Sequence, residues 1–308
     1  MIAVPTETLR SSFAAAFDRL NAEEHRAWLD HLVVNVSIIG FLLHLALVFL
    51  ARTLPNPPAI LAALGRNYLS AIYTPFSFIL FYEVLLLIAA LPESTTQSIA
   101  KQYEIVSLIF IRRFFKDIAE LDNISKLTQF SSDVRIIFID VVAGLFMFLM
   151  VTVFLHAGRR RVQPDTLPDE SLALKKFISR KKAIALGLSV LLVSLAVYSL
   201  AEFALDAWNV AYHGAPARLD PNTFFYTRVF TVMIFTDVLI VILSLEVSDR
   251  YELVFRNAAF VISTILIRLS LTVARPYGAS LALAGMLFGI FTLVVYNFHA
   301  RLSQLRAA

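Results

Sequence analysis

Among the charged residues within apolar stretches of the sequence, where ionised side chains are costly, six are candidates for intramembrane ion pairs. They are Glu83, Arg112, Arg113, Asp140, Asp237 and Arg268. A charge at the centre of a bilayer costs roughly 2.5–3.5 kcal/mol on insertion scales, so such residues usually pair with one another or line a path for ions or protons. A carboxylate held beside an arginine stays ionised. This disfavours a simple proton relay and favours a gate or an anion site.

The depth of these residues along their apolar stretches predicts two acid–arginine pairs. Glu83 lies about 9 residues, or roughly 13 Å, from the cytoplasmic end of its stretch, and Arg112 about 10 residues, or roughly 15 Å, from that of the next. Asp237 and Arg268 lie at about 9 and 12 residues, a step of roughly 4–5 Å. Each acid can therefore meet its arginine. Such pairs could serve a solute path, or they could serve only to fix the register of the helices.

Asp140 lies in a further apolar stretch, where it could pair with Arg113. The histidines form no spacing typical of a metal site, and the chain has no cysteine, which excludes disulfides and thiolate ligands. We therefore expect neither a metal nor a cofactor. Phosphate-binding loops, nucleophile elbows and zinc-protease motifs are absent from the sequence, so we expect no enzyme.

The elements that must position these residues are membrane helices. Hydrophobic residues make up 58% of the 308 residues and charged residues only 16%, and the mean hydropathy is +0.74. Such a chain fits a lipid bilayer as its solvent. We expect an all-α, polytopic fold of about eight transmembrane helices, each about 20 residues long. The apolar stretches are 32–51, 69–91, 102–121, 136–156, 183–205, 225–246, 257–274 and 278–298. The third is the weakest, because four charged residues interrupt it.

The distribution of Lys and Arg predicts the orientation. The predicted cytoplasmic segments hold sixteen of these residues and the predicted outside segments hold six, Arg275 among them. The positive-inside rule therefore places both termini and the basic linker of residues 159–182 in the cytoplasm. The linker could also bind anionic lipid. We interpret its charge as a topology signal and expect no nucleic-acid partner.

The two halves of the chain resemble each other. Residues 81–85 read FYEVL and residues 235–239 read FTDVL, and each acid is followed by a base and then by an arginine in an apolar stretch. The intervening bases, Lys101 and Arg256, are expected to close cytoplasmic turns. This order predicts two parallel four-helix repeats at 31–158 and 183–308, preceded by an amphipathic segment at 1–30. That segment could lie in the membrane interface or pack on the cytoplasmic ends of the bundle.

The second half resembles the phosphate-starvation-inducible PsiE family of four-helix membrane proteins. The resemblance rests on Asp237, on Arg256 nineteen residues later and on Arg268 twelve residues after that. The first half fits the same frame with Glu83 and Lys101, but it has two adjacent arginines and a lysine in place of an arginine. The resemblance implies a bacterial inner-membrane protein linked to stress or nutrient limitation, and it implies no reaction.

Two functions remain open from the sequence. The first is a non-enzymatic membrane protein that passes or gates ions or small solutes, with the acid–arginine pairs at its centre. The second is a stress-associated scaffold or regulator in which the pairs are structural. Gly285 and Gly289 form a small-residue motif on the last apolar stretch. It could mark the face of a homo-oligomer, or it could pack inside the bundle.

Overall fold

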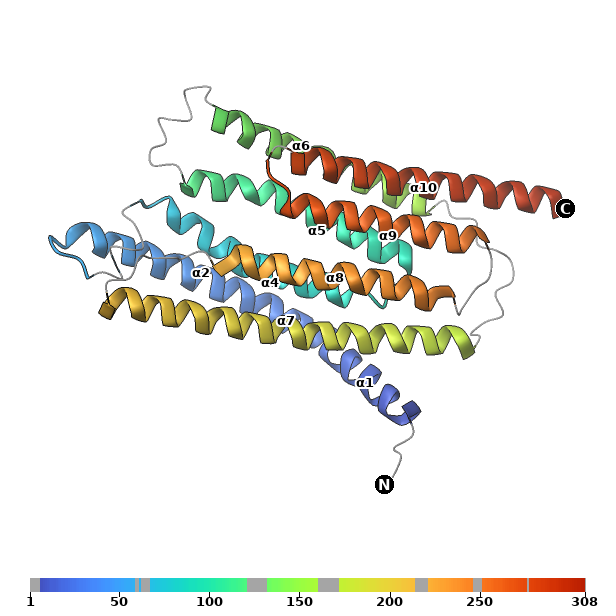
Figure 1. The fold of residues 1–308 in the computed structure, drawn as a ribbon, viewed down its shortest axis with the longest axis horizontal. Helices are drawn as coiled ribbons and strands as arrows, with labels where there is room; N and C mark the ends of the chain where they lie inside the picture. Colours follow the sequence, from blue (N-terminus) through green and yellow to red (C-terminus); the bar gives the residue numbers. More distant parts are fainter. Residues whose placement is uncertain are drawn as a thin grey trace.

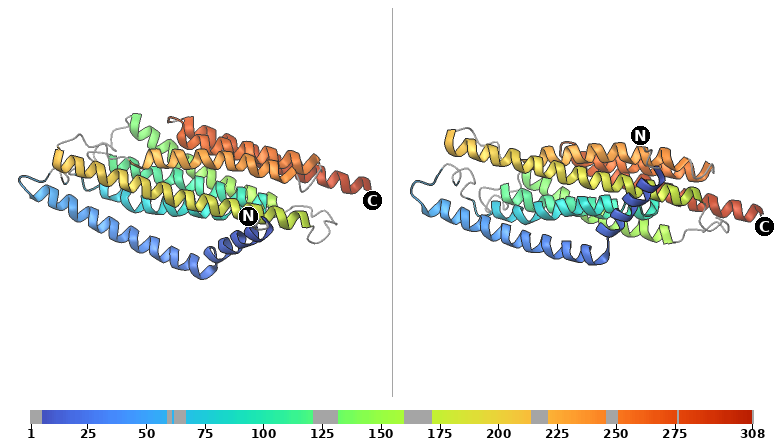
Figure 2. Two further views of the ribbon diagram at one scale, coloured as in Figure 1. Left: turned by 60° about the horizontal axis from the view of Figure 1, so that its bottom comes forward. Right: turned by 90° about the horizontal axis from the view of Figure 1, so that it is seen from below.

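The structure is a computed structural model that describes residues 6–58, 61, 67–120, 132–159, 172–213, 221–245, 251–275 and 277–307. These residues form nine helices and no strand. The helices are α1 (Thr6–Leu20), α2 (Glu23–Thr53), α4 (Ser70–Ala89), α5 (Thr95–Glu120), α6 (Ser132–Arg159), α7 (Leu172–His213), α8 (Pro221–Leu245), α9 (Tyr251–Thr272) and α10 (Tyr277–Ala307). All except α1 run along one common direction and form an elongated bundle (Figures 1 and 2).

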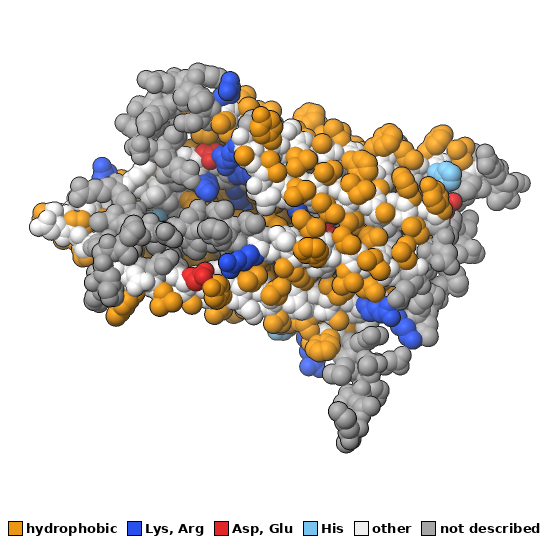
Figure 3. Space-filling model, in the orientation of Figure 1, with side chains coloured by type: hydrophobic (Ala, Val, Ile, Leu, Met, Phe, Trp, Pro, Cys, Tyr) orange, Lys and Arg blue, Asp and Glu red, His pale blue; other side chains and the backbone are white. Residues whose placement is uncertain are grey.

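Seven of these helices are long and apolar enough to cross a membrane: α2, α4, α6, α7, α8, α9 and α10. Large apolar side chains such as Leu145, Phe148 and Phe291 point outward from them, each more than half exposed. Orange apolar side chains cover the middle of the face shown in Figure 3, while Lys and Arg gather toward its two ends. This arrangement suits lipid around the middle and water at the ends. The chain is therefore a multi-pass membrane protein.

The remaining long helix, α5, corresponds to the weakest predicted span. Its charged residues, among them Arg112, Arg113 and Lys116, lower its hydropathy, and it is not among the seven candidate spans. It nevertheless packs between α4 and α6 and also touches α9. Arg112 and Asp117 form ion pairs with residues outside α5, whereas Lys101 and Glu104 pair with each other on the surface. That α5 is an eighth membrane crossing stays a prediction.

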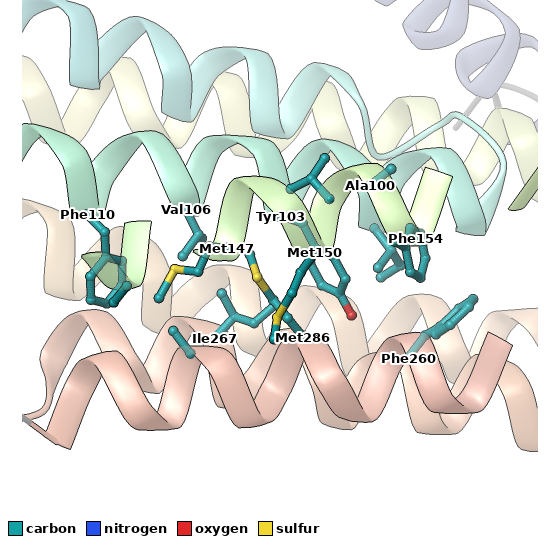
Figure 4. Packing of buried hydrophobic residues seen from close by; sticks show 14 of the residues in the cluster. Ala100, Tyr103, Val106, Phe110, Met147, Met150, Phe154, Phe260, Ile267 and Met286 are labelled. Atoms are coloured by element: carbon teal, nitrogen blue, oxygen red, sulfur yellow. The ribbon is translucent and has the colours of Figure 1, made fainter. Parts of the chain in front are cut away.

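Neighbouring helices pack in chain order within each half, and the most extensive contacts between the halves in the described part of the chain involve three helix pairs. The helix pairs α2–α4, α4–α5 and α5–α6 lie in one half, and α7–α8, α8–α9 and α9–α10 lie in the other. Between the halves, α6 packs on α10, α5 on α9 and α4 on α7. The largest core cluster lies among α5, α6, α9 and α10, where Tyr103, Phe110, Phe154 and Phe260 are completely buried (Figure 4).

Two predicted boundaries fall inside helices. The boundary at residue 30 lies within α2, which already begins at Glu23, and the boundary at residue 182 lies within α7, which begins at Leu172. At 1.5 Å per residue, the 42 residues of α7 span about 63 Å, roughly twice the hydrocarbon thickness. The bases from Lys175 to Lys182 therefore lie on the first turns of a helix that extends beyond the membrane. Residues 160–171 of the predicted linker lie outside the described residues.

The amphipathic N-terminal helix α1 packs on α7. Phe17 is buried in the core cluster that also includes residues of α4, α7 and α8, and Asp18 pairs with Lys182 at 2.7 Å. Phe13 and Leu20 remain about half exposed. One apolar side chain thus docks the helix on the bundle, and a place for the exposed ones in the membrane interface stays a prediction.

Candidate functional site

The first predicted pair joins α4 to α5. Glu83 is one of the few buried residues of α4, and its carboxylate accepts a hydrogen bond from the guanidinium of Arg112. The Arg112 side chain keeps 18% of its surface exposed, against 7% for Glu83. Because Arg112 also lines a cavity, this pair lies at the edge of a space that water can reach.

The second predicted pair joins α8 to α9 and is more deeply buried. Arg268 Nη1 lies 2.8 Å from Asp237 Oδ2, and the two side chains are only 2% and 6% exposed. The hydroxyl of Thr264, one helical turn before Arg268, lies 3.0 Å from the same carboxylate oxygen. Arg268 Nη2 donates a further hydrogen bond of 3.0 Å to Gln102 on α5. The pair in the second half is thereby tied to the first half.

Asp140 and Arg113, which the sequence suggested as a pair, form no direct ion pair, although each is the strongest opposite charge acting on the other. The ion-pair partner of Asp140 is Arg275, whose Nε lies 3.4 Å from Asp140 Oδ2. Arg275 also donates a 2.6 Å hydrogen bond to Asp117 at the end of α5. Residue 275 follows the end of α9, and its side chain pairs with acids of both α5 and α6. The guanidinium of Arg113 lies instead over the ring of Phe110, 4.2 Å from its centroid.

A cavity of about 300 Å³ adjoins these groups. Its charged lining residues are Arg112, Arg113, Lys116 and Arg275, and its other lining residues are Tyr73, Phe76, Leu80, Ile109, Phe230, Leu271, Thr272, Val273 and Ala274. It lies where α5 and α9 end, which is the predicted outer end of the bundle. The described part of its wall contains four cations and no acid. Glu83 pairs with Arg112, and Asp117 and Asp140 pair with Arg275, but none of these acids lines the cavity.

A smaller cavity of about 40 Å³ adjoins Asp237 at the opposite end of the bundle. Its polar lining includes Lys181, Gln102, Thr264 and Asn257. A space of this volume can hold a few water molecules where polar groups are available. Lys181 is buried and donates a 2.6 Å hydrogen bond to the carbonyl of Glu93. This contact fixes the start of α7 to the connection between α4 and α5.

The two bases expected in cytoplasmic turns lie instead inside helices. Lys101, in the second turn of α5, pairs with Glu104 at 2.8 Å. Arg256, in the second turn of α9, is buried, donates to Asn257 at 3.0 Å and lies 4.7 Å from the centroid of the Tyr296 ring. Neither forms an ion pair with Glu83 or Asp237, although the charge of Lys101 acts on Glu83 from a distance.

The small-residue motif of α10 packs inside the bundle. A Cβ added at Gly289 would lie 1.8 Å from the Tyr103 hydroxyl, and one at Gly285 would lie 3.2 Å from the Ser263 carbonyl. The Ser263 hydroxyl donates to the Gly285 carbonyl at 2.7 Å. With that proton used, the Tyr103 hydroxyl must donate its own to Ser263, at 2.6 Å. Close packing of α5, α9 and α10 thus accounts for both glycines.

Sequence reasoning missed several residues of this network. Arg275 counted as an outer-loop base, and Lys181 counted as part of a basic loop. Gln102 and Thr264 are uncharged, so nothing in their type distinguishes them. The available signal was spacing: Thr264 lies four residues before Arg268 and therefore on the same helical face.

Comparisons with protein-family models, with curated proteins and with solved structures return no match for this chain. Among the described residues, no three His, Asp or Glu side chains lie close enough to hold a metal ion. The charge pairs and the two cavities are the features from which a function can be inferred.

Proposed function

We propose that this membrane protein passes or gates ions or small solutes, and that the path runs beside the acid–arginine pairs. The observation that supports the proposal is the placement of the two cavities. The 300 Å³ cavity reaches Arg112 of the first pair from one end of the bundle. The 40 Å³ cavity reaches Asp237 of the second pair from the other end.

The pairs are suited to gating. Each carboxylate contacts an arginine of the next helix, so a solute can interact with either charge only when the pair opens. Arg268 is bound on one side by Asp237 and on the other by Gln102. A movement of α5 against α9 would change both contacts together. Such a movement could connect the two cavities.

Several further features belong to this proposal. They are the non-enzymatic character of the protein, the eighth crossing by α5, the duplicated four-helix layout and the cytoplasmic position of both termini. The resemblance to the PsiE family, with a bacterial inner membrane and a role in stress, is part of the same proposal. Both pairs join a helix to its successor, α4 to α5 and α8 to α9, which favours duplication.

Flux into proteoliposomes tests the proposal. The purified parent is compared with folded Glu83→Gln and Asp237→Asn variants for several cations, anions and protons, with and without a membrane potential. Arg301→Gln serves as a control, because Arg301 is exposed at the end of α10. We expect flux in the parent and in the control, and altered flux in both acid variants. No flux in well-folded parent protein for any ion would contradict the proposal.

The alternative is a scaffold or regulator with structural pairs. The near-complete burial of Asp237 and Arg268 favours it, as does the link from Arg268 to Gln102, which docks one half on the other. Under this alternative, the acid variants lose folded protein and the folded remainder behaves like the parent. The same proteoliposome experiment therefore separates the two functions.

A further inference from the structure

We infer that the 300 Å³ cavity, the vestibule, is a binding site for an organic anion that combines a carboxylate or phosphate group with a small apolar body. The inference rests on the proposed function in one respect, because it names the class of solute that would enter the path. Binding itself can be measured without transport.

The charge of the vestibule wall is one-sided. Its four charged lining residues are Arg112, Arg113, Lys116 and Arg275. Arg112 pairs with Glu83. Arg275 pairs with Asp117 and Asp140, and none of the three acids lines the vestibule. Within the described part of the chain, Arg113 forms no ion pair and its guanidinium contacts the Phe110 ring. The strongest opposite charge acting on Arg113 is Asp140, which already pairs with Arg275. Two guanidinium groups thus share one carboxylate near the membrane interior, where unbalanced charge is costly, and a bound anion would supply the further negative charge.

The type of cation indicates the type of anion. Three of the four are arginines, whose planar guanidinium matches carboxylate and phosphate oxygens with two parallel hydrogen bonds. Arg112 and Arg113 are adjacent on α5, and Arg275 approaches from the end of α9. A carboxylate or phosphate in the vestibule can therefore be approached from two helices, whereas a spherical halide would not use the planar geometry.

The rest of the wall requires an apolar body on the ligand. Tyr73, Phe76, Leu80 and Ile109 line one part of it, and Phe230 and Leu271 another. Phe76 stacks on Phe115 with ring centroids 4.3 Å apart, so this part of the wall is held in place. The vestibule, at about 300 Å³, lies at the small end of ligand pockets, which range over roughly 300–1,000 Å³. It fits a small aromatic or short-chain acid.

Equilibrium dialysis tests this inference on the full-length protein in phosphatidylcholine nanodiscs. The probes are radiolabelled benzoate, phenyl phosphate and hexanoate, with benzamide as the neutral counterpart of benzoate. We expect saturable binding of at least one anion with a Kd below ~10 mM, and no saturable binding of benzamide. No saturable binding of any of the three anions would overturn the inference.

Two variants locate the site. Arg113→Gln should weaken anion binding by about tenfold or more, since a hydrogen bond to a charged group is lost, and Arg113→Lys should restore part of the affinity. Arg301→Gln, the exposed control, should bind like the parent. If Arg113→Gln does not fold, Leu80→Trp tests the same point by filling the vestibule. Undiminished binding in the folded variant would overturn the assignment.

Two further arms identify the source of the anion and separate this inference from the proposed function. In nanodiscs of anionic phosphatidylglycerol, weaker benzoate binding would assign the vestibule to a lipid phosphate, and unchanged binding would assign it to a free organic acid. Flux in proteoliposomes without anion binding would contradict only the vestibule ligand. Anion binding without flux would contradict only the transport function.

Discussion

At the residue scale, the two acid–arginine pairs differ in their access to water, and this difference has a consequence for stability. Arg268 is 2% exposed, whereas Arg112 is 18% exposed beside the vestibule. Removing one partner of a buried pair strands the other charge and typically costs about 3–5 kcal/mol. Asp237→Asn should therefore destabilise the protein by roughly this amount, and Glu83→Gln should destabilise it less, because vestibule water can solvate Arg112.

Thermal unfolding in detergent, followed by loss of the monodisperse peak in gel filtration, measures this difference. Adding Arg268→Gln to Asp237→Asn should recover part of the lost stability, because the double variant no longer contains a stranded charge. Equal midpoints for the parent and both single variants would contradict the account of the pairs.

The sequence predicted the partners within each pair but not the groups around them. Glu83 and Arg112 could be matched because depth along consecutive spans follows from residue counting. Counting does not reveal how far the chain folds back after a helix, so Arg275 was placed in an outer loop and Arg113 was matched with Asp140. The bond from Arg268 to Gln102 links residues 166 positions apart. Only the docking of the two halves brings them together.

At the scale of elements, the packing of α10 against α5 and α9 depends on the absence of a side chain at Gly289. A Cβ there would lie 1.8 Å from the hydroxyl of the buried Tyr103 and 2.8 Å from that of Ser263. Gly289→Ala should destabilise the protein by about 1–3 kcal/mol, the usual cost of overpacking. The thermal midpoint of the detergent-solubilised variant measures this effect.

Gly187→Ala on α7 is the matched control, because nothing lies within 4 Å of the added Cβ. Alanine favours helices over glycine by up to about 1 kcal/mol, so this variant should be as stable as the parent or slightly more stable. Tyr103→Phe combined with Gly289→Ala should recover part of the lost stability by removing the hydroxyl. Equal thermal midpoints for Gly289→Ala, Gly187→Ala and the parent would show that the packing of α10 does not depend on the absence of a side chain at Gly289.

Hydropathy predicted most of the helices, because a lipid-facing helix must be apolar on its outer surface. The helix α5 is the exception for a physical reason. Some of its charges, such as Arg112 and Asp117, pair with residues of the surrounding bundle, so its mean hydropathy does not show that it packs among apolar helices. Hydropathy likewise could not place the starts of α2 and α7, whose first turns extend past the apolar region. The first turn of α2 is polar, and the start of α7 mixes apolar residues with Lys175 and Lys176, so neither start can be told from a loop by hydropathy.

At the scale of the whole molecule, the crossing by α5 decides on which side each loop lies. The chain contains no cysteine, so each introduced cysteine is the single thiol that a maleimide can label in that variant. Asn56, Ser94, Arg135 and Arg301 are exposed positions near the ends of the bundle. With eight crossings and cytoplasmic termini, a membrane-impermeant maleimide should label Asn56→Cys and Arg135→Cys in intact cells. It should label Ser94→Cys and Arg301→Cys only after permeabilisation.

Labelling of Asn56→Cys and Arg135→Cys on opposite sides would mean that α5 does not cross. The termini would then lie on different sides of the membrane, and the parallel repeat would be wrong. A uniform reversal of all four labels would retain the repeat and overturn only the orientation. The pattern thus tests the duplication and the positive-inside argument separately.

The central claim is that solutes pass through the vestibule on their way to the buried pairs. The most direct test is to block the vestibule in protein whose flux is being recorded. Leu80→Cys places a thiol in its wall, and Phe146→Cys places one on the outer surface of α6. Both are treated in proteoliposomes with a bulky maleimide, and mass spectrometry measures the extent of modification. We predict that modification at position 80 stops flux while modification at position 146 does not. Undiminished flux through fully modified Leu80→Cys protein would contradict the claim.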